Sequence, residues 1–297
     1  MKITKLKRRL LNHECILMDG AMGTEILNQG VETKLPLWSA EALLTHPEVV
    51  QKIHEAYIKA GAQIITTNTF RTFKRAFAKK GIADKARKAT ILACKLAQQA
   101  REKTKTLDKV FIAGSVAPLE ECYSPELTPP VEELEAEHDE YVQDLRDGGV
   151  DFILLETMIT LRETRAALKA IKKYNLPWAV SFCVNDKNQL LGGESLIDAV
   201  KEVQKEKPLF IGINCIDIKT ATSAVKYLHK LTPLPVSVYA QGDGGPDDDQ
   251  GWKFAEKEKQ ETYLRAVEQW QKDGAQIIGA CCGSTPEYIR KIRRLVC

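Results

Sequence analysis

Apolar and polar positions along this chain form short strand-like runs that are separated by longer helical stripes. Eight short, largely apolar runs are typical of buried parallel strands, and they cover residues 15–19, 63–68, 110–116, 152–156, 178–184, 210–215, 236–241 and 276–281. Segments with helical spacing lie between them, most clearly at residues 47–60, 131–147, 161–174 and 256–273. Helix-ending glycines, such as Gly61, Gly149 and Gly274, stand just before the next strand.

Repeated strand–helix units predict an α/β protein with one closed (β/α)8 TIM barrel, which forms a single domain over residues 1–297. The alternative is an open, doubly wound sheet. That fold usually carries a glycine-rich phosphate loop after its first strand, and residues 19–25 (DGAMGTE) do not have the required spacing. The closed barrel is therefore favoured, with residues 1–9 as an exposed helical lead-in.

Composition narrows the classes of function. The 43 Lys and Arg residues nearly balance the 40 Asp and Glu residues in a chain of 297, and the two signs are interspersed. This pattern argues against nucleic-acid binding and is compatible with an oligomer. No apolar run is long enough for a membrane span, and none follows the basic start as in a signal peptide. We expect a cytoplasmic protein whose eight cysteines remain reduced.

Polar residues end the apolar runs, and barrel enzymes place their chemistry at these strand ends. The residues at these ends are Asp19, Asn68, Ser115, Glu156, Asn214, Cys215, Tyr239, Cys281 and Cys282. Glu156 is either a structural ion-pair partner or a binder of an ammonium group. Asp19 either caps a turn or acts with the backbone N–H groups of Gly20–Gly23, which could hold a carboxylate. Together these features predict a clamp for an amino acid.

Three cysteines form the strongest chemical signal. Cys215, Cys281 and Cys282 end two of the runs, and three thiolates suit a soft tetrahedral metal such as zinc with one position left open. The adjacent pair can share a metal only if the chain bends there, which Gly283 permits. The alternative is that these cysteines are merely buried small apolar residues. The remaining cysteines lack matching partners and are interpreted as structural: Cys15, Cys94, Cys122, Cys183 and Cys297.

Other polar groups do not form a second site in the sequence. Surface or helix-capping positions account for His46, His54, His138 and His229, which argues against a hydrolytic zinc site built on histidines. The acidic, glycine-rich segment 243–249 is interpreted as a solvated loop. Attraction of a cationic substrate is its less favoured interpretation.

Five motifs together resemble the homocysteine S-methyltransferase family: residues 19–25, 67–70 (TNTF), 156–157, 212–215 (GINC) and 279–283 (GACCG). The resemblance extends from about residue 11 to residue 292 and implies a zinc-dependent (β/α)8 barrel that methylates homocysteine to methionine. It implies that Cys215, Cys281 and Cys282 bind zinc, which activates the homocysteine thiol. The remaining site residues that it implies are Asp19 and Glu156 for the ammonium, Gly20, Met22 and Gly23 for the carboxylate, and Asn214 to orient or contact the site. The family's double glycine before the cysteine pair is Gly279-Ala280 here, so we expect crowding at this strand end without loss of metal.

The methyl donor is the least determined part of this resemblance. The chain has no room for the folate, cobalamin or flavin modules of some relatives, so a small donor is expected. Trp38 resembles the donor-site tryptophan of relatives that use betaine or S-methylmethionine, and it is equally compatible with a packing role. Arg71 replaces an aromatic residue of betaine-using relatives and could receive a donor carboxylate. This favours S-methylmethionine or S-adenosylmethionine, with betaine second. A subunit that docks on a corrinoid protein and a non-catalytic zinc- or thiol-binding barrel remain as alternatives.

Overall fold

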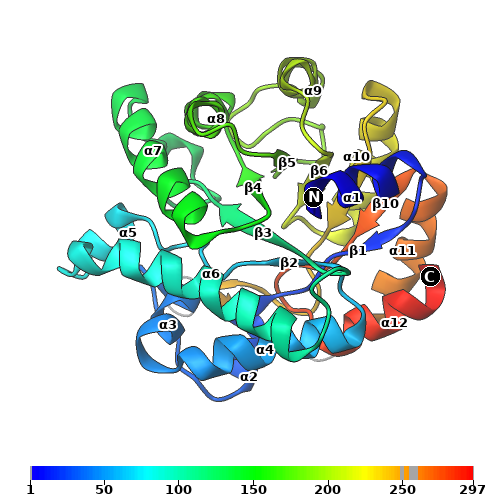
Figure 1. Ribbon diagram of the computed structural model, residues 1–297. Coiled ribbons are helices and arrows are strands. Elements are labelled where there is room, and N and C mark those ends of the chain that lie inside the picture. The colour runs from blue at the N-terminus through cyan, green and yellow to red at the C-terminus, as the bar shows by residue number, and fades with distance from the viewer. Residues whose placement is uncertain (1, 248–250, 254–259, 297) are drawn as a thin grey trace.

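A computed structural model describes residues 2–247, 251–253 and 260–296 of the chain (Figure 1). The strands are β1 (Ile16–Leu17), β2 (Ile64–Thr66), β3 (Phe111–Val116), β4 (Phe152–Met158), β5 (Trp178–Phe182), β6 (Ile211–Asn214), β7 (Val236–Tyr239), β8 (Gly245–Asp247), β9 (Gly251–Lys253) and β10 (Ala275–Ile278). The α-helices are α1 (Lys2–Leu11), α2 (Met22–Asn28), α3 (Glu41–Thr45), α4 (Pro47–Ala60), α5 (Lys74–Ala78), α6 (Ala86–Lys103), α7 (Val131–Gly148), α8 (Leu161–Lys173), α9 (Leu196–Val203), α10 (Ile218–Leu231), α11 (Gln260–Lys272) and α12 (Pro286–Val296).

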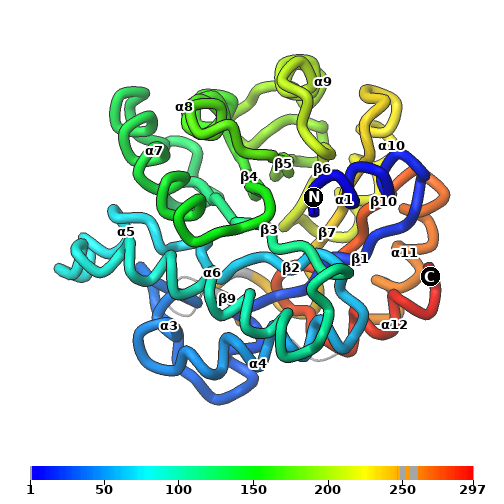
Figure 2. Tube along the Cα trace, in the orientation of Figure 1, coloured from blue at the N-terminus to red at the C-terminus, as the bar shows by residue number. Residues whose placement is uncertain are grey.

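Eight parallel strands form a ring in the order β1-β10-β7-β6-β5-β4-β3-β2. A parallel bridge between Met18 and Ile64 brings β1 against β2 and closes the ring. Figure 2 traces this path from blue β1 through green β4 to orange β10, which returns beside β1. The predicted (β/α)8 barrel is confirmed. The first and last predicted strands, residues 15–19 and 276–281, were too long. In the structure β1 has only two residues and β10 ends at Ile278.

The inside of the barrel is filled by large side chains near the amino ends of the strands. Phe111, Phe152 and Phe210 belong to this inner cluster, and the rings of Phe152 and Phe210 meet edge to face at 6.0 Å. Leu6 and Leu10 of α1 join the same cluster, with exposed fractions of 0% and 4%. The expectation of an exposed lead-in is therefore wrong, because α1 closes the amino end of the barrel with its apolar face.

The outer helices pack on the barrel through the apolar stripes that predicted them. In α4, for example, Val50, Ile53 and Tyr57 are buried, and Gly61 ends the helix at a φ of +121°. Arg293 of α12 lies against Gly61, where a side chain on residue 61 would collide with it. In the described part of the chain, no helix is both long and apolar enough to span a membrane.

The segment after β7 departs from its prediction as a solvated loop. Strands β8 and β9 pair antiparallel, and Asp243 is buried beside them. The carboxylate of Asp243 accepts a hydrogen bond from the hydroxyl of Tyr288, and its carbonyl accepts one from the indole N–H of Trp252. Asp243 thus fixes a buried connection. Residues 248–249 of the predicted loop, Cys297 and the first residues of the predicted helix 256–273 lie outside the described residues.

Candidate functional site

A cavity of about 480 Å³ opens at the carboxyl end of the barrel, opposite the end that α1 closes. Its lining includes most residues that the sequence singled out, namely Asp19, Gly20, Met22, Gly23, Trp38, Asn68, Arg71, Glu156, Cys215, Tyr239, Cys281 and Cys282. These residues come from segments that are far apart in the chain but follow strands of the same ring. The barrel therefore brings the candidate chemistry into one pocket.

The sulfur atoms of Cys215, Cys281 and Cys282 all lie within 4.8 Å of one another. Cys281 Sγ is 3.0 Å from Cys215 Sγ and 4.0 Å from Cys282 Sγ. Cys215 directly follows β6 and has a left-handed φ of +55°. The pair Cys281-Cys282 lies in a turn beyond β10, where Ser284 N–H donates to the carbonyl of Cys281 at 3.2 Å.

Glycine makes this turn possible. Gly283 has a φ of +79°, and a side chain there would lie 2.0 Å from the carbonyl oxygen of Asp243. Only glycine takes this conformation in so small a space. Because the strand has already ended, the two adjacent cysteine side chains are not forced to opposite faces.

Hydrogen bonds among the three thiols shift their pKa values in opposite directions. Hydrogen bonds from the Cys281 and Cys282 thiols hold the pKa of Cys215 well below its ordinary value. The same bonds to Cys215, together with burial, raise the pKa values of Cys281 and Cys282. Cys215 is thus the most acidic of the three thiols, and the thiol protons of its two neighbours favour its thiolate form. A cation bound between the sulfurs would replace those two protons.

Two buried carboxylates lie beside the cysteine cluster. Burial raises the pKa of Glu156 to about 7, opposed by the hydrogen bond that the Ser115 hydroxyl donates. Burial also raises the pKa of Asp19 well above its ordinary value, although Thr66 N–H donates to its carboxylate at 2.8 Å. The two carboxylates repel each other, which adds to the shift of Asp19. Such a pair favours a cationic group between them.

The turn before α2 is tied to the cysteine turn. Ser284 Oγ accepts a hydrogen bond from Ala21 N–H at 3.1 Å, and Thr24 Oγ1 accepts one from Gly283 N–H at 2.9 Å. The N-cap of α2 is Ala21, whose side chain cannot accept hydrogen bonds from the first turn, so within the described residues the leading N–H groups are available to an anion. The turn before α2 and the turn after β10 thereby form one wall of the pocket.

Trp38 and Arg71 also line the pocket. The Trp38 ring lies against Gly23, where a side chain would approach it to 2.4 Å, and meets Phe70 edge to face at 6.2 Å. Trp38 holds a left-handed φ of +45°, a conformation that is uncommon for a bulky residue and costs free energy. Arg71 forms an ion pair with Glu121 at 2.7 Å.

Sequence and structure comparisons identify the family. The family model for homocysteine S-methyltransferase matches residues 16–296. The homocysteine S-methyltransferase of Escherichia coli is 31% identical, over 97% of each chain. The chain belongs to the homocysteine S-methyltransferase family. The crystal structure of the metallated form of the Escherichia coli homocysteine methyltransferase MmuM has a TM-score of 0.85 at 29% identity, covering 98% of this chain and 99% of that one. A selenocysteine Se-methyltransferase from Brassica oleracea is 28% identical over 94% of this chain and 88% of its own.

As a member of this family the protein is an enzyme that methylates a homocysteine thiol, and its cysteine cluster is a candidate metal centre. Asn214 does not line the cavity. Its side-chain oxygen accepts a hydrogen bond from Thr157 N–H at 2.9 Å, and its amide donates to Thr157 Oγ1 at 2.8 Å. Thr157 has a φ of +57°, which is rare for a β-branched residue. Asn214 thus fixes the strained residue that follows Glu156.

The structure corrects the predicted surface or capping positions of two histidines. His54 and His138 are fully buried and not at the surface. His138 pairs with the buried Glu163 at 3.1 Å, and neither ring nitrogen of His54 has a partner within the described residues. These histidines do not line the cavity, so they add no ligands to the cysteine cluster.

Sequence reasoning missed two residues that contact Cys215. The Tyr123 hydroxyl lies 3.2 Å from Cys215 Sγ, and Gln241 Nε2 donates to both the Tyr123 hydroxyl and the Cys215 carbonyl at 3.0 Å. Tyr123 lies in the loop after β3, several residues beyond the strand end. No spacing rule identifies such a contact, although Gln241 closely follows β7 and its position was a usable signal.

Proposed function

We propose that this enzyme transfers a methyl group from a small sulfonium donor to the thiol of L-homocysteine, giving methionine, with zinc held by Cys215, Cys281 and Cys282. The observation that carries the proposal is the position of three sulfur atoms within 4.8 Å of one another in a pocket that also holds two buried carboxylates. Sulfurs around a tetrahedral zinc at about 2.3 Å lie about 3.8 Å apart. The spacings of 3.0 and 4.0 Å bracket this value, so the donor set fits the ion.

Bound by these thiolates, zinc would supply a Lewis-acid centre with an open position that lowers the pKa of an incoming thiol. The carboxylates of Asp19 and Glu156 would hold the homocysteine ammonium beside it. The free N–H groups at Met22 and Gly23 would receive the substrate carboxylate. Asn214 would keep Glu156 in place through Thr157. These contacts aim one amino-acid thiol at the cysteine cluster.

The donor side of the pocket supports an amino-acid sulfonium. The Trp38 face attracts a sulfonium or ammonium cation by about 0.5–2 kcal/mol. Arg71 and Glu121 present one positive and one negative group next to each other, which matches the carboxylate and ammonium of S-methylmethionine or S-adenosylmethionine. Betaine has no free ammonium and would leave Glu121 unused. The cavity of about 480 Å³ further favours S-methylmethionine, the smaller of the two sulfonium donors.

Six cysteines of the described residues are free thiols, namely Cys94, Cys122, Cys183, Cys215, Cys281 and Cys282. A metal site made of thiolates needs a reducing compartment, so we propose that the enzyme acts in the cytoplasm as part of methionine synthesis.

The direct test supplies zinc-loaded enzyme and homocysteine with S-methylmethionine, S-adenosylmethionine or betaine in separate reactions and measures methionine. We expect S-methylmethionine to give the highest kcat/KM. Activity with betaine alone would overturn the choice of donor. Cys215→Ala should retain neither zinc nor activity, and a metal-free Cys215→Ala variant that kept full activity would refute the role of the cluster.

A further inference from the structure

Tyr123 contacts Cys215 in a way that the proposed roles of the site leave unexplained. Its hydroxyl lies 3.2 Å from Cys215 Sγ and 3.3 Å from the carbonyl oxygen of the same residue. Gln241 Nε2 already donates to that carbonyl and also to the tyrosine oxygen, each at 3.0 Å. A tyrosine has one proton to donate. The carbonyl already has Gln241 as a donor, whereas a Cys215 thiolate can only accept and forms the stronger, charge-assisted bond at the shorter of the two distances, so the thiolate receives the tyrosine proton.

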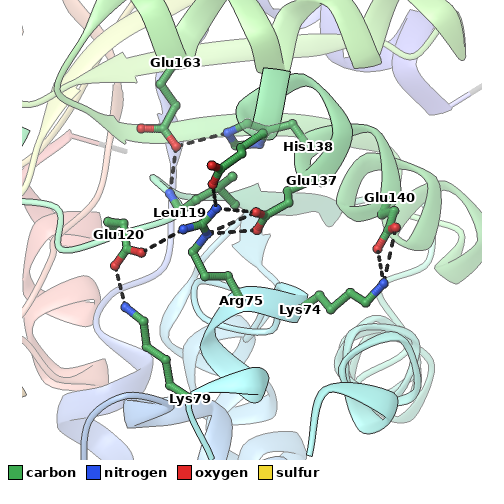
Figure 3. Close-up of polar contacts among 10 residues, drawn as sticks. Lys74, Arg75, Lys79, Leu119, Glu120, Glu137, His138, Glu140 and Glu163 are labelled. Atoms are coloured by element: carbon green, nitrogen blue, oxygen red, sulfur yellow. Dashed lines mark hydrogen bonds and ion pairs between the residues drawn. The ribbon is translucent and has the colours of Figure 1, made fainter. Parts of the chain in front are cut away.

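The loop that carries Tyr123 is anchored at three consecutive residues. The backbone N–H of Leu119 donates to Glu163 at 2.7 Å, and Glu163 is itself held by His138 (Figure 3). Glu120 pairs with both Arg75 and Lys79, as Figure 3 also shows. The third anchor is the ion pair of Glu121 with Arg71 at 2.7 Å. The hydroxyl of Tyr123 is therefore held at a fixed place beside Cys215.

This placement matters because the pocket would hold several sulfur nucleophiles and one reactive methyl group. If Cys215 attacked the donor, a carbon–sulfur bond would form on Cys215, the methyl–sulfonium bond would break, and its electron pair would leave with the thioether. The product, S-methylcysteine at position 215, has no thiolate left to bind a metal. A hydrogen bond to a thiolate withdraws charge from the sulfur and makes it a weaker nucleophile.

We propose that Tyr123 is a positioning residue that holds the Cys215 thiolate as a ligand and protects it from methylation, so that the methyl group goes to the substrate thiol. The inference rests on the proposed function, since it requires a sulfonium donor and a metal-bound Cys215. It assigns to Tyr123 a part in choosing which sulfur reacts.

The test compares Tyr123→Phe with the wild-type protein, both loaded with zinc. Each is treated with iodoacetamide in one arm and with S-methylmethionine plus homocysteine in the other. Peptide mass spectrometry then measures modification at Cys215 separately from that at Cys281 and Cys282, and the zinc content is measured before and after. We expect alkylation of Cys215 to be on the order of tenfold faster in Tyr123→Phe, with methylated Cys215 and loss of zinc during turnover.

Tyr174→Phe is the matched control, because it removes one tyrosine hydrogen bond, to Gln143 at 3.2 Å, from the outer helices. Its cysteines should react as in the wild type. A second variant, Gln241→Met, removes the hydrogen bond that Gln241 donates to the Tyr123 hydroxyl. It should also raise the alkylation rate of Cys215, which keeps the test decisive if Tyr123→Phe folds poorly.

Two results would overturn the proposal. One is an unchanged rate at Cys215 in a zinc-loaded Tyr123→Phe protein. The other is an equal increase at all three cysteines together with immediate loss of zinc, which would mean that Tyr123 only supports the local fold. The iodoacetamide arm does not depend on methionine formation. Failure of the wild type to form methionine would therefore count against the proposed function and not against the contact.

Discussion

Glu156 and Asp19 are two acids that burial pushes toward the neutral state, in a pocket where the proposed function needs them charged. The pKa of Glu156 is about 7, and that of Asp19 is also raised. An ammonium between the carboxylates reverses this effect, since an opposite charge favours ionisation. In the free enzyme, keeping both buried carboxylates charged costs free energy, and a bound ammonium group offsets that cost. This favours binding of a cationic amino acid over a neutral thiol.

A pH profile tests this account at the level of one residue. Below pH 7 the free enzyme protonates Glu156 and loses the charge that attracts the ammonium, so kcat/KM for homocysteine should fall as pH decreases through about 7. Glu156→Gln should lower kcat/KM on the order of 100-fold, from about 3 kcal/mol for a buried charge pair, and should remove this inflection.

Glu135→Gln provides the matched control, because Glu135 pairs with Lys169 on the outer helices. It should leave the profile unchanged. A Glu156→Gln variant that retained the wild-type KM for homocysteine would exclude Glu156 from the ammonium site.

At the scale of elements, α1 stabilises the barrel without taking part in the pocket. Its two buried leucines fill the amino end of the barrel, while the site lies at the carboxyl end. Leu6→Ala should lower the free energy of unfolding by about 2–5 kcal/mol, because it leaves a cavity in the inner cluster.

Leu11→Ala is the control within the same helix, since Leu11 is 79% exposed, and it should change stability by less than about 0.5 kcal/mol. Urea unfolding measures both variants, and kcat of the folded Leu6→Ala enzyme should remain close to that of the wild type. Equal stability of the two variants would show that α1 does not close the barrel.

The sequence predicted the barrel and the cysteine cluster for the same physical reason. Strands that are buried on both faces must be continuously apolar, so the polar residue that ends each run, such as Glu156 or Cys215, is visible without coordinates. Residues 1–9 were misinterpreted because a short, highly basic helix gives little sign that two leucines on one face have a cavity to fill. Tyr123 and Gln241 escaped prediction because their contacts with Cys215 join separate loops, and only the closed ring brings those loops together.

At the scale of the whole molecule, His54 and the buried carboxylates make stability depend on pH in opposite directions. Burial lowers its pKa to about 4, whereas an unfolded histidine titrates near 6.5. Between these values the unfolded chain binds a proton that the folded chain does not. The contribution of His54 to the free energy of unfolding should therefore decrease by on the order of 3 kcal/mol as pH falls from 6.5 to 4, whereas the contribution of Glu156, whose pKa is raised, increases over part of this range.

Relative to the wild type, His54→Leu should gain stability as pH falls from 6.5 to 4, as measured by urea unfolding at a series of pH values. His13→Asn, at an exposed position where asparagine tolerates the φ of +55°, should leave the slope unchanged. Identical slopes for wild type and His54→Leu would show that the buried histidine does not contribute to the pH dependence of stability.

The central claim is that three cysteines, separated by up to 67 positions in the sequence, share one metal ion that keeps a vacancy for the substrate thiol. X-ray absorption at the zinc edge, recorded on the same sample before and after homocysteine is added, tests it most directly. The account predicts three sulfur neighbours at about 2.3 Å and one lighter atom before addition, and four sulfur neighbours after it. A coordination shell that has fewer than three sulfurs, or that does not change with homocysteine, would contradict it.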